Sequence, residues 1–168
     1  NYPIEIMPPE PIQIPELDGE SIAKRIGLAL QMKTIANRDS NLIDPQPFEA
    51  FHELLRTLYP QLEEKLSREV VNRHALLYTW EGRDPNLEGI CLMAHQDVVP
   101  ADETADSGWT YPPFSGTVAD GYVWGRGSLD CKGSLIAILE AVNNLVKAGF
   151  QPERNIYLAF GDDEEVGG

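Results

Sequence analysis

The sequence is poor in cysteine and in basic residues, and it has no long apolar run. Its 168 residues include two cysteines, Cys91 and Cys131, which are too few for a disulfide framework and form no Cys-x-x-Cys pair. No apolar stretch approaches the roughly 20 residues of a membrane-spanning helix, so we expect no membrane segment in this chain. Lys and Arg number 13 against 27 Asp and Glu, a formal net charge of −14. This balance argues against nucleic-acid binding, which needs basic side chains to displace phosphate counterions.

Motifs for several other functions are also missing. The sequence has no Gly-x-Gly-x-x-Gly and no Walker-type phosphate loop. Ser128 and Ser134 do not lie in a Gly-x-Ser-x-Gly elbow, which argues against a serine hydrolase. No acidic run has the Asp-x-Asp-x-Asp-Gly spacing of a calcium loop.

The first half of the chain predicts an extended arm and two helices. Residues 1–16 contain five prolines, a density that excludes a regular helix. Asp18 can cap a helix that runs to about Ala36, and a second helix follows Asp44-Pro45 and ends at Pro60. Apolar residues recur at helical spacing in both helices: Ile22, Ile26, Ala29 and Leu30 in the first, and Phe48, Phe51, Leu55 and Leu58 in the second.

The second half predicts strands around one amphipathic helix. The expected strands are residues 75–80, 90–94, 122–124 and 156–160. The continuous apolar run 90–94 predicts a strand that is buried on both faces. A helical stripe from Leu135 to Val146 predicts a helix that stops near Gly149. The order strand, helix, strand predicts a right-handed crossover, and hence an α/β three-layer sandwich with a mostly parallel sheet.

Three short polar segments, residues 95–97, 127–130 and 161–165, each follow an apolar run. In open α/β sheets, ligands gather at the carboxyl ends of the strands. His95 and Asp97 are two residues apart and share one side of an extended chain, so His95 can bind a metal while Asp97 orients its ring. The alternative is a His–Asp pair at the protein surface.

The acidic residues of the other two segments each have a structural and a functional interpretation. Asp130 precedes the predicted helix, where it is either an N-cap or a ligand whose two oxygens bridge two cations. Glu164 and Glu165 lie between a buried strand and Gly167-Gly168. They form either a solvated acidic loop or a pair in which one Glu binds a metal and the other moves a proton.

Taken together, these segments resemble the co-catalytic zinc exopeptidases that include carboxypeptidase S, Gly-Xaa carboxypeptidase, acetylornithine deacetylase and succinyl-diaminopimelate desuccinylase. The matching stretches are residues 93–100, 109–114 with Gly116, 124–127 with Asp130 and Lys132-Gly133, and 163–168. Residues from about 17 onward fit the family pattern. The runs 68–72 and 76–80 are most similar to the carboxypeptidase S branch.

The resemblance implies a role for each candidate residue. His95 would bind one zinc ion and Glu165 the second, and Asp130 would bridge both. Asp97 would orient His95, and Glu164 would be the general base that takes a proton from the water between the metals and passes it to the leaving amine. The native metal is open, because cobalt and manganese can share such ligands with zinc.

The chain departs from the family pattern in two ways. Cys131 follows Asp130 where many relatives carry a second Asp, and Asp162 stands where near relatives often carry His. Neither is an implied ligand, so we expect the site to be tuned and not lost.

The family's third ligand for each zinc, an Asp and a late His, is expected beyond Gly168, with an inserted domain that binds substrate and often mediates homodimerisation. We therefore expect residues 1–168 alone to bind zinc poorly and to have no useful turnover.

The resemblance implies a metallopeptidase or amidohydrolase that cleaves an amide next to a free carboxylate, in peptides or N-acyl amino acids. The alternatives are a biosynthetic N-acyl amino acid deacylase and a non-catalytic interaction module on the same scaffold. Residues 17–168 would be the N-terminal portion of the catalytic domain.

Overall fold

The computed structural model describes residues 16–168, so the predicted arm (1–16) lies outside the described residues except for Glu16. The helices are α1 (Gly19–Leu30), α2 (Gln46–Leu58), α3 (Pro60–Lys65) and α4 (Lys132–Lys147), with short 3-10 helices η1 (Ser40–Leu42) and η2 (Glu164–Val166). The strands are β1 (Ser67–Val71), β2 (Ala75–Trp80), β3 (Ile90–His95), β4 (Thr117–Ala119), β5 (Tyr122–Trp124) and β6 (Ile156–Gly161). No helix among these residues is long and apolar enough to cross a bilayer.

The main sheet has the strand order β1-β2-β6-β3, and β4 pairs with β5 in a separate hairpin. β3 and β6 are parallel, as expected for two strands joined through α4. The prediction of a mostly parallel sheet is wrong for the described strands, because β1–β2 and β2–β6 are both antiparallel. The short connection between β1 and β2, with Asn72 at a φ of 54°, makes a hairpin, and a hairpin is antiparallel by construction.

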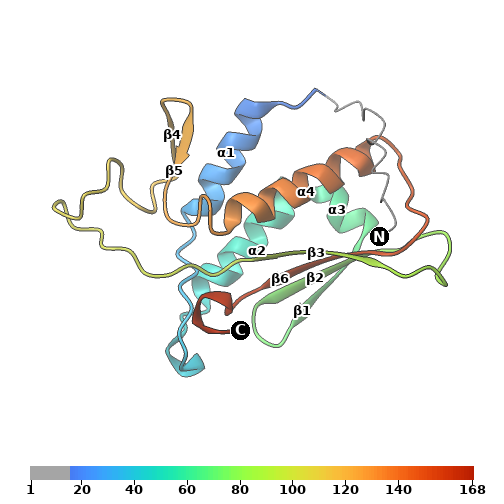
Figure 1. The fold of residues 1–168 in the computed structure, drawn as a ribbon, viewed down its shortest axis with the longest axis horizontal. Helices are drawn as coiled ribbons and strands as arrows, with labels where there is room; N and C mark the ends of the chain where they lie inside the picture. Colours follow the sequence, from blue (N-terminus) through green and yellow to red (C-terminus); the bar gives the residue numbers. More distant parts are fainter. Residues whose placement is uncertain (1–15) are drawn as a thin grey trace, which may run out of the picture.

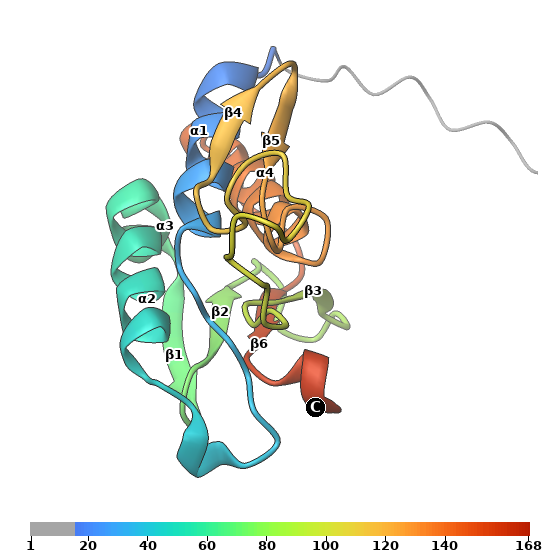
Figure 2. The same ribbon diagram turned by 90° about the vertical axis from the view of Figure 1, so that its left-hand side faces the viewer.

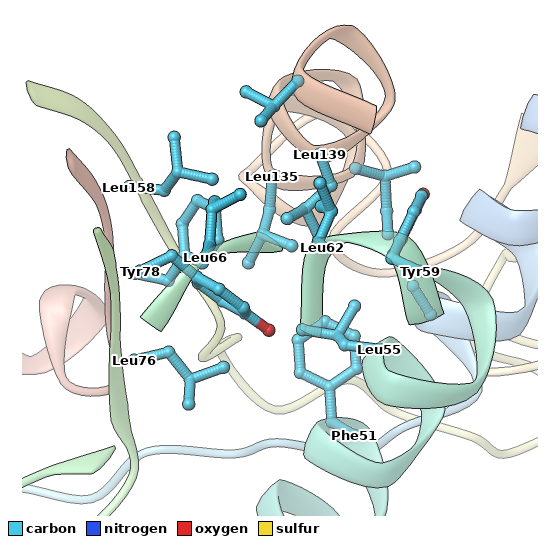
Figure 3. Close-up of a cluster of buried hydrophobic side chains, with 14 of the residues drawn as sticks. Phe51, Leu55, Tyr59, Leu62, Leu66, Leu76, Tyr78, Leu135, Leu139 and Leu158 are labelled. Atoms are coloured by element: carbon cyan, nitrogen blue, oxygen red, sulfur yellow. The ribbon is translucent and has the colours of Figure 1, made fainter. Parts of the chain in front are cut away.

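The four α-helices lie on the same side of the main sheet (Figures 1 and 2). The hydrophobic core fills the space between these helices and the sheet. Figure 3 shows Leu76, Tyr78 and Leu158 of the sheet pointing toward α2, α3 and α4. The α/β fold class is therefore confirmed. The prediction that β3 is buried on both faces is wrong for the described residues, because Met93 is 74% exposed on the face that these helices leave uncovered.

Helix boundaries follow local signals except at the end of α1. Asp18 caps α1 through its side chain, Pro60 separates α2 from α3, and α4 ends just before Gly149. The prediction that the first helix reaches Ala36 is wrong, because α1 ends at Leu30. The chain then becomes extended, and Ile35 pairs with Val98 in an isolated parallel bridge.

Candidate metal centre

The three polar segments meet at the carboxyl ends of β3 and β6. His95 is the last residue of β3 and pairs with Gly161, the last residue of β6. The segment that carries Glu164 and Glu165 therefore leaves the sheet beside His95. Asp130 reaches the same point from the loop before α4. Parallel neighbours end at the same edge of a sheet, which explains why segments distant in sequence converge here.

The His95 ring lies between two aspartates. Its Nδ1 is 3.1 Å from the main-chain oxygen of Asp97 and 3.3 Å from Asp97 Oδ1. Its Nε2 is 2.9 Å from Asp130 Oδ1 and 3.7 Å from Glu164 Oε2. His95 is buried and Asp97 is fully buried, so the interpretation as a surface pair is wrong. The two ring nitrogens thus face different carboxylates.

Asp130 is not the cap of α4. The N-cap position belongs to Cys131, and no side chain caps the helix, so the Asp130 carboxylate is left to face His95. The loop can fold this closely onto α4 because residue 133 is glycine: a Cβ there would lie 2.1 Å from the main-chain oxygen of Ser128. The Asp130–Cys131 peptide bond is cis. Close packing of this loop aims Asp130 at the end of β3.

Glu164 and Glu165 begin the short helix η2 and differ in their surroundings. The main-chain N–H of Glu165 donates a hydrogen bond to Asp97 Oδ2 at 3.0 Å, which fixes η2 to the end of β3. The Glu164 side chain is largely exposed, with its carboxylate near His95 Nε2. The main chain of η2 is therefore fixed to the end of β3, while the Glu164 carboxylate stays accessible.

Crowded charges change the proton affinity of this site. Burial raises the pKa of Glu165, and the negative charges of Asp130, Asp97 and Glu164 raise it further, against the effect of His95. Burial alone would lower the pKa of His95, but its hydrogen bond to Asp130 and the charge of Asp97 outweigh burial and raise it. A proton on Nε2 and a divalent cation compete for the same lone pair, and a cation would also relieve the repulsion among the carboxylates.

The donor atoms present fit a metal ion. Ligand atoms of His95, Asp130 and Cys131 all lie within 4.8 Å of one another, a cluster of imidazole, carboxylate and thiol that suits zinc. Glu165 is outside this cluster, although its carboxyl group is close enough to be affected by Asp130 and His95. No pattern in the sequence places Cys131 among the donors.

Buried polar residues beside the site were also missed. Lys132 is fully buried, its Nζ donates to the main-chain oxygens of Ala29 and Met32, and burial lowers its pKa to about 7. Gln96 and His52 are buried as well. Two signals could have revealed Gln96 and His52: Gln96 is a polar residue between His95 and Asp97, and His52 is a histidine inside the apolar stripe of the second helix.

Residues 91–168 match the model of peptidase family M20/M25/M40. The chain is 42% identical to "Probable carboxypeptidase S-like 2" of Dictyostelium discoideum over 171 residues, which cover 98% of this chain and 32% of that protein. It is 47% identical to "Carboxypeptidase S" of Saccharomyces cerevisiae over 130 residues, which cover 74% of this chain and 23% of that protein. Residues 91–168 therefore match this peptidase family, and most of the chain is similar to proteins named carboxypeptidase S or carboxypeptidase S-like.

The fold of this chain is also found in a solved structure. The structure of human carnosine dipeptidase 1 matches with a TM-score of 0.69 at 21% identity, over 88% of this chain and 33% of that chain. At this identity the match establishes the shared fold alone. The chain spans about a third of the length of the Dictyostelium relative and of the dipeptidase.

Proposed function

We propose that the full-length protein is a zinc-dependent hydrolase of amide bonds that lie next to a free carboxylate, of the carboxypeptidase or aminoacylase type. The observation that carries this proposal is the arrangement of His95, with one ring nitrogen toward buried Asp97 and the other toward Asp130 and Glu164. The names of the similar M20 proteins support a carboxypeptidase.

His95, Asp130 and Glu165 would hold zinc, with Asp130 shared between two ions. Zinc, when bound, supplies Lewis acidity that polarises a carbonyl group and makes water more acidic. Asp97 would accept a hydrogen bond from His95 Nδ1–H, which leaves the lone pair of Nε2 free to bind the metal. His95 Nδ1 lies 3.3 Å from Asp97 Oδ1, which supports this positioning role.

Glu164 would be the proton carrier. Its exposed carboxylate can receive a proton from the attacking water and later donate it to the nitrogen of the leaving amine. A group with this task must reach both water and substrate, and the Glu164 side chain, 64% exposed and 3.7 Å from His95 Nε2, meets that requirement. Asp97, which is fully buried, does not.

The test uses the purified full-length protein with dipeptides, N-acyl amino acids and acetylornithine assayed side by side. We expect hydrolysis of dipeptides or of N-acyl amino acids, its loss after chelation, and its recovery when zinc is returned. Preference for acetylornithine would identify the biosynthetic deacylase instead. Zinc binding without hydrolysis of any of these substrates would favour the non-catalytic module and contradict the proposal.

A further inference from the structure

Gln96 lies between the two residues that define the His95 end of the site, yet its side chain points away from it into the protein. It is fully buried. Its amide nitrogen donates hydrogen bonds to the main-chain oxygens of His74, at 2.8 Å, and Phe160, at 3.0 Å. Its Oε1 is 2.9 Å from Nε2 of His52. One side chain thus joins the end of β3 to β6, to the β1–β2 turn and to α2.

His52 completes this arrangement from α2. Its Nε2 is also 3.0 Å from the main-chain oxygen of His74, and both neighbours are acceptors, so Nε2 carries the proton and donates to them. The main chain of Gln96 is satisfied too: its N–H donates to Gly161 O, and its carbonyl accepts from the Thr34 hydroxyl at 2.6 Å. Every polar group of the fully buried Gln96 is therefore paired.

The acceptors on β6 connect this network to the other half of the site. Phe160 and Gly161 are the last two residues of β6, directly before the segment that carries Glu164 and Glu165. Gln96 is bound to both through its side chain and its main chain. A displaced Gln96 would therefore change the spacing between the histidine and glutamate sides of the centre, which metal binding requires to be fixed within fractions of an ångström.

We propose that Gln96 and His52 are positioning residues, which act through the ends of β3 and β6 to hold His95 and η2 at the separation that the metal centre needs. This inference rests on the proposed function, because it assigns the network to the same centre. Outer residues that orient metal ligands commonly contribute about 10- to 100-fold to metal affinity or activity.

The test compares four variants of the full-length protein. Gln96→Leu removes the amide, His52→Phe removes the donor but keeps a ring, and His52→Gln supplies new N–H donors. The matched control is Tyr59→Phe, which removes a buried hydrogen bond to Glu140, 2.7 Å long, between α4 and the α2–α3 junction. Measurements are kcat, KM, the zinc dissociation constant by chelator competition, and the visible spectrum of the cobalt-substituted protein.

We expect Gln96→Leu to lower kcat and zinc affinity about 10- to 100-fold and to change the cobalt spectrum. His52→Phe should shift the same quantities in the same direction, and His52→Gln should restore most of the loss. Tyr59→Phe should lower the melting temperature and leave kcat, zinc affinity and the cobalt spectrum unchanged.

The inference is overturned if folded Gln96→Leu and His52→Phe match Tyr59→Phe, with losses of thermal stability alone. If Gln96→Leu does not fold, the comparison of His52→Phe with His52→Gln tests the inference by the same measurements. If the wild-type protein binds metal but hydrolyses nothing, the proposed function fails, while zinc affinity and the cobalt spectrum still decide the inference. A wild-type protein that binds no metal contradicts both.

Discussion

The helix-covered core and the carboxyl-end edge of the sheet both contain buried side chains, but these are of opposite kinds. The core contains leucines and aromatic rings such as Leu135, Leu158 and Phe160, all within 1% of complete burial. Each such side chain contributes roughly 1.5–3 kcal/mol by leaving water. This region stabilises the fold without needing any particular partner atom.

The edge, a few residues farther along the same strands, buries His95, Gln96, Asp97 and Lys132. Buried polar and charged groups cost free energy unless they are paired. Here the pairing is incomplete, since Asp97 Oδ1 has no hydrogen-bond partner and only faces His95 Nδ1 at 3.3 Å. The difference teaches that the helix-covered core stabilises the fold, whereas the carboxyl-end edge holds the polar groups of the proposed chemistry, and that each can be altered separately.

The largest expected effect comes from removing the proton carrier at the edge. Glu164→Gln should lower kcat by about 10²- to 10⁴-fold, the usual contribution of a general acid–base group. Zinc content and melting temperature should stay at the wild-type values, because Glu164 is exposed. The control is the exposed neighbour Asp163→Asn, which should keep wild-type turnover. An unchanged kcat in Glu164→Gln would refute its assigned role.

A core substitution should lower stability and leave the metal centre unchanged. Leu158→Ala removes a fully buried side chain, and the cavity should lower the free energy of unfolding by about 2–5 kcal/mol in denaturant titrations. Leu158→Met conserves volume and should cost less than about 1.5 kcal/mol. The folded fraction of both variants should bind zinc with wild-type affinity. A zinc affinity that falls in step with stability would show that core and edge are not separable.

Asp97→Asn tests the edge without changing its shape. The amide keeps an oxygen for the Glu165 N–H but loses the charge beside His95. Zinc affinity should fall about 10- to 100-fold in competition with a chelator. The unfolding free energy should fall less than in Leu158→Ala. Wild-type zinc affinity in this variant would contradict the orienting role of Asp97.

The smallest expected effect is on the pH dependence of stability. Burial lowers the pKa of His52 from its ordinary value of 6.5, so the unfolded chain binds this proton more readily than the folded one. Stability from this group is therefore complete above about pH 6.5 and decreases as the pH falls, by at most about 1.4 kcal/mol per pH unit. His52→Gln should remove this component in urea titrations between pH 5 and 8, and an identical slope in the variant would contradict it.

Much of the fold could be predicted from local patterns. The short apolar and aromatic run 75–80 and the helical stripe from Leu135 to Val146 each lie within one segment, so β2 and α4 were predicted with little error. The antiparallel pairing of β2 with β6 could not be predicted, because partner choice depends on residues far apart in sequence. The end of α1 was missed for the same reason: Lys132, about 100 residues away, donates hydrogen bonds to the main-chain oxygen of Ala29 in the last turn of α1 and to that of Met32 just beyond it.

The candidate site, too, could be predicted from the sequence only in part. Spacing and residue type sufficed to select His95, Asp97, Asp130, Glu164 and Glu165, whose assigned roles stay predictions. The positions of Gln96 and Cys131 depend on how the loop before α4 and the turn at His74 fold around β3, which no local pattern encodes.

The most direct test of the account is anomalous diffraction at the zinc edge from crystals of the full-length protein. Two neighbouring peaks are expected, both in contact with Asp130, one about 2.0–2.1 Å from His95 Nε2 and the other about 2.0–2.2 Å from a Glu165 oxygen. Zinc peaks remote from the ends of β3 and β6, or a His95 ring that binds metal through Nδ1, would contradict the account.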